Sequence, residues 1–265
     1  MKLDLFAIRK SIPAAHYYTL AVLGFLFSIL LYTWISHQSW CNPLFVPKPG
    51  QIWTAFIGQM QSPELWMDIK SSFYRVTGGF LLATLFALPL GIYMGTFRSV
   101  ESFFQPQMEF LRYVPVPALV PLVMIFCGIG EWAKIMLIFL GTFFQLVLMI
   151  ADEVRRIPID LIQCSQTLGA SRGEIIRSVL ARAAMPGIFD ALRLCNGWAW
   201  TYVIVAELVA STEGMGFRIM RFYRFIQTPE IFVYLILLGV IGLLLDYFFR
   251  KLNARLFHWA DTSKR

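Results

Sequence analysis

The sequence predicts an all-α integral membrane protein with about six transmembrane helices. Hydrophobic residues make up 58% of the chain and charged residues only 15%, and the mean hydropathy is +0.64. These values lie well outside the range of ordinary soluble domains. The chain also contains about six apolar runs with the length of roughly 20 residues that crosses about 30 Å of hydrocarbon. The connections between the runs are too short for a separate soluble domain.

The expected spans follow one another from the amino end. They cover residues 17–35, 73–95, 104–127, 132–151, 186–210 and 231–250. The first run is too long for the apolar region of a signal peptide, and no small-residue cleavage site follows it, so we expect it to stay in the mature protein. Segment 47–57, rich in proline and aromatic residues, predicts a short amphipathic helix on the outer surface. We therefore divide the chain into an anchor region, residues 1–70, and a core membrane domain, residues 71–265.

The distribution of basic residues predicts the orientation. Lysine and arginine gather before the first span, after the fourth span and at the carboxyl end. With about six spans, all three clusters lie on one side of the membrane, and such clusters mark the cytoplasmic side. We expect both termini in the cytoplasm. Because these clusters account for much of the net charge of +7, nucleic-acid binding is not expected.

A polar stretch, residues 157–185, separates the fourth span from the fifth. Pro158 suits a helix start, and Gly169 suits a helix end or a tight turn. Ser171 and Glu174 have the spacing of a capping box. Two short amphipathic helices joined by a turn are therefore predicted on the cytoplasmic face. A DNA-binding role is disfavoured, because a hairpin tethered between two spans is poorly placed to enter a major groove.

Several motifs carry a family resemblance. The segment from Gln163 to Pro186 resembles the cytoplasmic E-A-A-x-x-x-G signature of ATP-binding-cassette (ABC) importer permeases. The stretch Leu168-Gly-Ala-Ser-Arg172 resembles the nitrate, sulfonate, taurine and bicarbonate branch of these permeases. Further similar stretches are residues 112–117, 121–122, 128–134, 184–187, 200–208 and 213–217. The resemblance covers most of the chain from about Ser71 onward.

The resemblance implies a bundle like that of type I ABC importer permeases, in which the hairpin is a coupling helix that seats in a groove of a separate ATPase subunit. The candidate coupling residues are Gln163, Leu168, Gly169, Ala170, Ser171 and Glu174. The chain has no G-x-x-x-x-G-K-[ST] loop to hold phosphate. We therefore expect a non-catalytic subunit without a cofactor of its own, with ATP and magnesium bound by the ATPase.

The resemblance also implies the remaining partners and the location. They are a periplasmic or lipid-anchored solute-binding protein, a second copy or close relative of the permease, and the lipids of a bacterial inner membrane. Three residues depart from the signature: Gln163, Cys164 and Ser165 stand where the family commonly has Glu-Ala-Ala. Arg182 stands where a proline often follows the second helix. We therefore expect the hairpin to dock through polar contacts that differ from the usual ones.

Ionisable residues within spans are the candidates for a solute pathway, because a charge in hydrocarbon is costly unless it is paired or hydrated. Arg112 precedes three prolines that free backbone carbonyls. It either pairs with Glu109 or lines a pathway for an anion. Arg193 is expected to face a cavity, with a structural role as the alternative. Glu207 either packs against the loop at 213–217 or takes part in gating.

Two further features of the last spans follow from residue type and spacing. Asn196 is a polar amide in the middle of the fifth span and is expected to contribute to the pathway, whereas the nearby aromatic residues suit packing. Asp246 and Arg250 are four residues apart and are expected to form a structural ion pair.

The candidate arginines favour a small anion such as nitrate, bicarbonate, taurine or an alkanesulfonate. Two alternatives stay open: a self-contained channel or secondary transporter, and a membrane scaffold whose hairpin recruits a soluble protein. The four scattered cysteines and three ungrouped histidines predict neither a disulfide framework nor a metal site. The sequence contains no H-E-x-x-H motif and no nucleophile elbow, which argues against a membrane enzyme.

Overall fold

The structure is a computed structural model that describes residues 13–208 and 211–259, and every regular element in these ranges is helical. The all-α class is confirmed. The elements are α1 (Ala14–Ser36), α2 (Pro49–Gln61), α3 (Pro63–Thr96), α4 (Arg98–Arg112), α5 (Val116–Cys127), α6 (Glu131–Arg155), α7 (Ile159–Thr167), α8 (Arg172–Glu174), the π-helical segment η1 (Ile175–Leu180), α9 (Ala181–Leu208), α10 (Met215–Arg224) and α11 (Thr228–Leu256).

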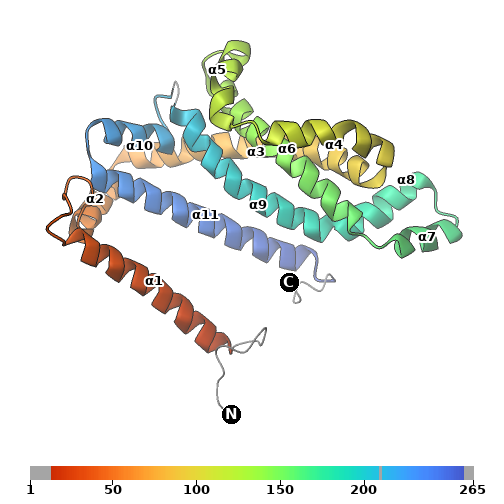
Figure 1. Ribbon diagram of the computed structural model, residues 1–265, viewed down its shortest axis with the longest axis horizontal. Coiled ribbons are helices and arrows are strands. Elements are labelled where there is room, and N and C mark those ends of the chain that lie inside the picture. The colour runs from red at the N-terminus through yellow and green to blue at the C-terminus, as the bar shows by residue number, and fades with distance from the viewer. Residues whose placement is uncertain (1–12, 209–210, 260–265) are drawn as a thin grey trace.

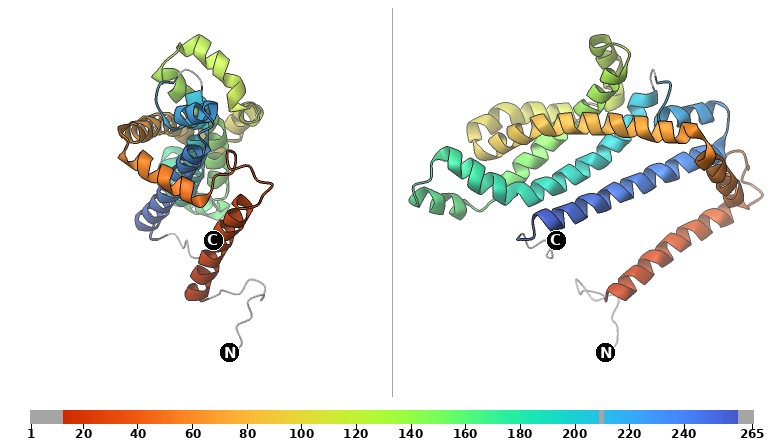
Figure 2. Two further views of the ribbon diagram at one scale, coloured as in Figure 1. Left: turned by 90° about the vertical axis from the view of Figure 1, so that its left-hand side faces the viewer. Right: turned by 180° about the vertical axis from the view of Figure 1, so that it is seen from behind.

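The long helices form an elongated bundle. Helix α3 packs along α6, and α9 packs between α6 and α11 (Figure 1). One end of the bundle carries α2 and α10, and the other end carries the hairpin of α7 and α8 (Figure 2). Helix α1 diverges from the bundle. Helix α5 rises from the bundle and packs its buried Val116, Val120 and Val123 against α6 and the end of α9. The two ends of the bundle therefore carry different structures, and the candidate residues are distributed between them.

Glycines allow α3 and α6 to approach closely. A Cβ atom at Gly79 would lie 2.7 Å from the Ile138 Cβ, and one at Gly91 would lie 2.7 Å from the Ile150 Cβ. At Gly95 the nearest atom, the Val154 Cβ, would be only 2.6 Å away. Small residues at one face of a helix let two backbones pack tightly in a membrane, where hydrophobic attraction between helices is weak. This contact makes α3 and α6 a single packed unit.

Length and composition identify four helices of the described residues as long and apolar enough to cross a membrane: α1, α3, α6 and α11. A fifth candidate is the bent pair of α4 and α5. Helix α9 holds the span expected at residues 186–210, of which 209 and 210 lie outside the described residues. Its 28 residues extend about 42 Å, but it is not among these candidates.

The span expected at residues 104–127 is not one straight helix but the bent pair of α4 and α5. Helices α4 and α5 meet at an angle of 104°. Pro115 and Pro117 explain the break, because a proline lacks the backbone N–H that a helix interior requires and disfavours helical geometry in the residue before it. Helix α4 is also strongly amphipathic, with a charged face that a membrane interior would not tolerate.

The prediction of two short hairpin helices is only partly right. Helix α7 is short, with nine residues. The second helix instead continues from Arg172 through η1 into α9, since Ile175 and Ala181 at the junctions keep right-handed helical backbone angles. No glycine or proline lies between Glu174 and Pro186 to end it. A π-helical turn marks the junction between the hairpin and the long helix.

The amino-terminal region is loosely attached to the bundle. Helix α2 forms where the short amphipathic helix is expected, and only 6% of the most apolar window of α1 is buried. The division at residue 70 falls inside α3, whose buried Leu65 and Asp68 belong to the core. The packed core therefore begins a few residues before this division.

Candidate functional site

A buried network of charges lies at the end of the bundle opposite the hairpin. We call it the Arg75 cluster, and its members are Asp68, Ser72, Arg75, Glu131, Glu207, Glu213 and Arg218. It joins α3, the start of α6, the end of α9 and the segment that leads into α10. Arg75, Asp68 and Glu207 are each at most 1% exposed.

Arg75 is the centre of this cluster. Its Nε and Nη2 atoms donate to the two oxygens of Glu131 at 2.6 and 2.8 Å. Its Nη1 donates to Glu207 Oε1 and to the Glu213 carbonyl oxygen, both at 2.8 Å. The planar guanidinium fits this forked arrangement of acceptors, which an ammonium group does not. Lys134 adds a second cation on Glu131 at 2.7 Å.

Glu207 and Asp68 fix the turn before α10. Glu207 Oε2 accepts from the Gly216 N–H at 2.8 Å, and Glu207 Oε1 accepts from the Ser72 hydroxyl at 2.7 Å. Asp68 accepts from the Gly214 N–H at 2.8 Å and from Arg218 Nε at 2.7 Å. Gly214 has φ of +118°, and a Cβ there would meet the Glu207 carboxylate at 2.4 Å, so the turn requires glycine.

These contacts place Glu207 against the loop at 213–217, with its carboxylate fully buried among partners. A part in gating stays a prediction. Asp68 and Arg75 were missed as candidates. Arg75 could have been found from the sequence, because it lies in the apolar run at 73–95 and an arginine there needs an acidic partner.

A cavity of about 410 Å³ adjoins the cluster. It is lined by Met67, Lys70, Ser71, Tyr74, Glu131 and Glu213. The side chains of Glu131 and Glu213 are 49% and 39% exposed, whereas that of Arg75 is 1% exposed. The cluster therefore has a solvent-exposed side, formed by Glu131 and Glu213, and a buried side, formed by Arg75 and Glu207.

Arg112 lies exposed at the end of α4. Its Nη2 donates to the Tyr113 hydroxyl at 3.0 Å, and its guanidinium carbon lies 4.9 Å from the centre of that ring. The ion pair with Glu109, one of the two alternatives drawn from the sequence, does not form in this structure. Glu109 instead accepts from Gln105 Nε2 at 2.7 Å, because both side chains lie on the same face of α4, four residues apart.

Arg193 lies between α9 and α11. Its nearest acidic atoms belong to Asp246, at 3.6 Å, and Asp190, at 3.9 Å. Asp246 also accepts from Arg250 Nε at 2.7 Å, as expected from their spacing. Asn196 is half-buried one turn further along α9. The structure thus places Arg193 at a helix contact in the half of the bundle nearer the hairpin, away from Arg112.

The hairpin lies at the other end of the molecule. Ser171 caps the second helix as expected: its N–H and hydroxyl donate to Glu174 Oε2 at 2.8 and 2.7 Å, and its hydroxyl accepts from the Glu174 N–H at 3.4 Å. These hydrogen bonds lower the pKa of the Glu174 carboxyl group. Gly169 has φ of +82° in the turn, and Gln163 is exposed on α7.

The tip of the hairpin exposes an apolar side chain. Leu168 is 87% exposed, more than any other large hydrophobic residue in the described part of the chain. Ala170 beside it is half-buried, and its N–H donates to the Ser165 carbonyl oxygen at 3.0 Å. The tight turn therefore presents Leu168 outward on a rigid support.

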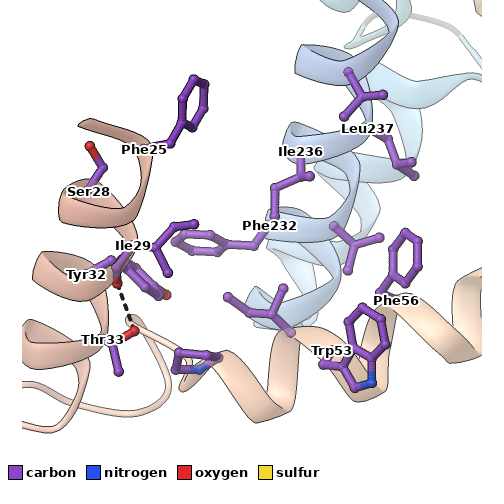
Figure 3. Close-up of a pocket in the computed structure, with 14 residues that line it drawn as sticks. Phe25, Ser28, Ile29, Tyr32, Thr33, Trp53, Phe56, Phe232, Ile236 and Leu237 are labelled. Carbon is purple, nitrogen blue, oxygen red and sulfur yellow. Dashed lines mark hydrogen bonds between the residues drawn. The ribbon is translucent and has the colours of Figure 1, made fainter. Parts of the chain in front are cut away.

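Another cavity lies between α1, α2 and α11 and has a volume of about 660 Å³ (Figure 3). Its walls are mostly aromatic and aliphatic. Ser28, Tyr32 and Thr33 supply hydroxyl groups, and each of these donates to a backbone carbonyl oxygen. No candidate pathway residue lines it. Among the described residues, no group of three or more His, Cys, Asp or Glu side chains is arranged to hold a metal ion.

The chain is a bundle of long apolar helices, with a buried charge cluster at one end and a helical hairpin at the other. These features define a multi-pass membrane protein of the helical-bundle class. Comparison with protein families then shows which one. Residues 87–258 match the family described as the binding-protein-dependent transport system inner membrane component, and the chain belongs to this family.

Relatives with curated descriptions agree with this assignment. The chain is 32% identical over 240 residues to the taurine transport system permease protein of Escherichia coli, covering 88% of this chain and 87% of the relative. It is 34% identical over 217 residues to a putative aliphatic sulfonates transport permease protein of Bacillus subtilis, covering 82% and 79%. The bicarbonate transport system permease protein of Synechococcus elongatus is 32% identical over 192 residues, covering 72% and 69%.

A solved structure shares the fold. A chain of the MetNI methionine ABC transporter in an inward-facing conformation superposes with a TM-score of 0.63 at 20% identity, covering 74% of this chain and 98% of that chain. The type I importer bundle is therefore confirmed. The protein is a non-catalytic ABC permease subunit, and in this family a separate ATPase hydrolyses ATP, with a solute-binding protein and a paired permease completing the transporter.

Proposed function

We propose that this chain forms the translocation pathway of an importer for a small anion and couples to its ATPase through the hairpin at 157–185. Relatives over most of the chain are described as permeases for taurine, aliphatic sulfonates and bicarbonate. Sulfonate and bicarbonate groups are anions at neutral pH. This shared chemistry supports an anionic solute, and nitrate belongs to the same class. Arg112, Arg193 and Asn196 are the proposed pathway residues, and Glu207 acts on the pathway through the Arg75 cluster.

The observation that carries the coupling role is the exposed Leu168. An apolar side chain held out on a tight turn at the end of a membrane bundle is expected to insert into a groove of a partner protein. Gln163, Gly169, Ala170, Ser171 and Glu174 shape the surface around it. In this arrangement the hairpin and both termini face the cytoplasm of a bacterial inner membrane, and the Arg75 cluster faces the periplasm. A second copy of the chain is the proposed permease partner.

The test is co-purification of this chain from native membranes. A stoichiometric ATPase with a phosphate-binding loop, together with uptake of radiolabelled taurine, alkanesulfonate, bicarbonate or nitrate that requires ATP, is the expected result. A chain that purifies alone and conducts solute in liposomes would show a self-contained channel or secondary transporter. A chain that binds a soluble protein without transporting any solute would show a scaffold.

A matched pair of variants tests the hairpin. Leu168→Ser is expected to weaken ATPase association by about tenfold or more, because a buried apolar anchor at an interface contributes on the order of 2 kcal/mol. Ile159→Ser alters an apolar residue that is 60% exposed at the base of α7, and it is expected to have a smaller effect. Equal effects of the two variants would contradict the assignment of Leu168 as the anchor.

A further inference from the structure

One continuous helix connects the two ends of the bundle. Segments α8, η1 and α9 contain 3, 6 and 28 residues and follow one another without a break, so the combined helix extends about 55 Å. It begins at the hairpin turn and ends one residue beyond Glu207. A force on the hairpin can therefore reach Glu207 along one unbroken run of helix, which includes the π-helical turns of η1 and Pro186 in α9.

Glu207 is where this long helix is held to α3 by charge. Its carboxylate accepts from Arg75 Nη1 at 2.8 Å and from the Ser72 hydroxyl at 2.7 Å, and both donors belong to α3. Arg75 and Glu207 are 1% and 0% exposed. A hydrogen-bonded ion pair that is shielded from water holds its partners in a defined geometry. The pair therefore fixes the end of α9 against α3.

Arg75 is also tied to α6. The glycine contacts pack α3 against α6 along their length, and Arg75 holds both oxygens of Glu131 at the start of α6. The Glu213 carboxylate lies a further 3.9 Å from Arg75. Loss of Glu207 therefore leaves the arginine with acidic partners, whereas water entering the opened gap would hydrate the Glu207 carboxylate.

Building on the proposed function, we propose that the Glu207–Arg75 ion pair is a latch that closes the outer side of the pathway. Movement of the hairpin by the ATPase pulls Glu207 away from Arg75 and Ser72, and the outer ends of α9 and α3 separate. Glu207 and Arg75 are gating residues that act by position and do not touch the solute. Arg75 keeps its two hydrogen bonds to Glu131 when Glu207 leaves, so the arginine is not left without an acidic partner in the open state.

Thiol labelling in the assembled transporter tests the latch. The four native cysteines are replaced, and a reporter is introduced as Val203→Cys, since Val203 is 0% exposed and lies one turn before Glu207 on α9. The complex with ATPase and binding protein in nanodiscs is treated with a membrane-impermeant maleimide, without nucleotide and with ATP in the absence of magnesium. A second reporter, Ile138→Cys, monitors the α3–α6 contact, where Ile138 is also 0% exposed.

With native Glu207, labelling at position 203 is expected to be slow without nucleotide and faster with ATP. Glu207→Gln keeps the shape but removes the charge, so labelling without nucleotide should rise about tenfold or more and lose its response to ATP. Glu131→Gln removes an acid from the same arginine without touching α9 and should give a smaller rise. Glu230→Gln, in the first turn of α11 at the same end of the molecule, serves as the control and should change nothing.

Ser72→Ala is a milder second variant and should give an intermediate rise, because it removes one donor to Glu207 but leaves Arg75. Unchanged labelling at position 203 in both Glu207→Gln and Ser72→Ala would overturn the latch while leaving the proposed function intact. Labelling at position 138 as well would show general loosening of the bundle and would also overturn it. Failure of the native chain to bind any ATPase would overturn both the latch and the proposed function.

Discussion

Single buried residues hold the end of the bundle that carries α10. Asp68 is 0% exposed and accepts hydrogen bonds from Gly214, Arg218 and the Tyr234 hydroxyl, the last at 2.9 Å. These donors come from α10, from the turn before it and from α11, so one carboxylate positions three segments. The apolar runs predicted the helices that surround it, but Asp68 precedes the span at 73–95 and gave no signal of burial. Its role follows only from tertiary contacts.

Asp68→Asn is expected to destabilise the protein by about 3–5 kcal/mol, because it leaves Arg218 buried without a counter-charge. The measurement is the temperature at which the purified subunit in detergent loses its native elution volume. Arg98→Gln is the matched control. The Arg98 side chain is 87% exposed and pairs with Glu101, so this change should cost no more than about 1 kcal/mol. Similar shifts for both variants would argue against a structural role for Asp68.

The capping box at Ser171 gives a prediction about pH. Hydrogen bonds from Ser171 lower the pKa of the Glu174 carboxyl group below its ordinary value of 4.5. A carboxyl group with a lowered pKa in the folded state stabilises that state above the unfolded pKa, and this contribution is lost as the pH falls through the folded pKa. The cap should therefore be intact at pH 7 and weakened below about pH 4.

Hydrogen exchange can follow this cap directly. Protection of the Ser171 and Glu174 amides, corrected for intrinsic rates, should decrease on acidification in the native chain. In Ser171→Ala, protection of the Glu174 amide should already be low at pH 7, because loss of an N-cap side chain costs about 1 kcal/mol. The Ala170 amide, which donates to the Ser165 carbonyl oxygen, is the internal control. The Ser171 amide donates to the Glu174 carboxylate, so a pH-independent Ser171 amide would contradict the assigned cap.

The pairing of α3 with α6 is set at the level of helices. Both spans were predicted from their apolar runs, whereas the glycine contact that joins them was not. Gly91 is one of several glycines in the chain, and only the packed structure shows that a Cβ there would lie 2.7 Å from Ile150 and 2.9 Å from the Val147 carbonyl oxygen. The apolar composition thus predicted which helices form. Which helices pack together depends on the close contacts that glycines allow, and these are visible only in the folded structure.

Gly91→Ala is expected to force α3 and α6 apart and to lower stability by about 1–3 kcal/mol. Gly239→Ala on α11 is the matched control. A Cβ at Gly239 would meet no atom within 4 Å, so that change should be neutral or stabilising by up to about 1 kcal/mol. Thermal denaturation of the two variants in the same detergent measures the difference. Equal stability would indicate that the interface can adjust without cost.

The bend in the span at 104–127 and the length of the second hairpin helix were predicted less well, and both depend on where helix-breaking residues lie. The run at 104–127 is apolar enough for one span, but the local effect of its prolines outweighs its overall composition, and the chain bends by 104°. The hairpin was located correctly, and Ser171 and Glu174 form the expected cap. The length of its second helix was underestimated because the polar face of residues 172–185 hides its continuity with α9. The hydrophobic pattern of the sequence therefore located the helices. The presence or absence of proline and glycine determined where each helix ends.

At the scale of the whole molecule, the two ends of the bundle differ in how they are built. The hairpin end is held by exposed side chains and a local cap, so it is free to engage a partner. The opposite end is held by buried charges contributed by α3, α6 and α9 and by the segment before α10. A transporter needs one end that receives a force and one end that changes its exposure, and the continuous helix from Arg172 to Leu208 joins them.

Helix α1 lies outside this arrangement. Its contacts with the bundle are near its carboxyl end, where the Tyr32 ring lies 5.6 Å from that of Phe232 and the Tyr32 hydroxyl donates to the Pro47 carbonyl oxygen at 2.7 Å. Most of its side chains are exposed in the isolated chain. The match to the permease family begins only at residue 87. We therefore expect the core to fold without α1.

A shortened chain that begins at Lys48 tests this expectation. It keeps α2 and everything after it, so it retains the Arg75 cluster, the α3–α6 contact and the hairpin. In membranes that also contain the ATPase, the shortened chain should still co-purify with it, and its thermal midpoint should fall by only a few degrees because little buried surface is lost. The same shortened chain with Asp68→Asn should fail to assemble. Loss of ATPase binding in the shortened chain alone would show that α1 is part of the folded core.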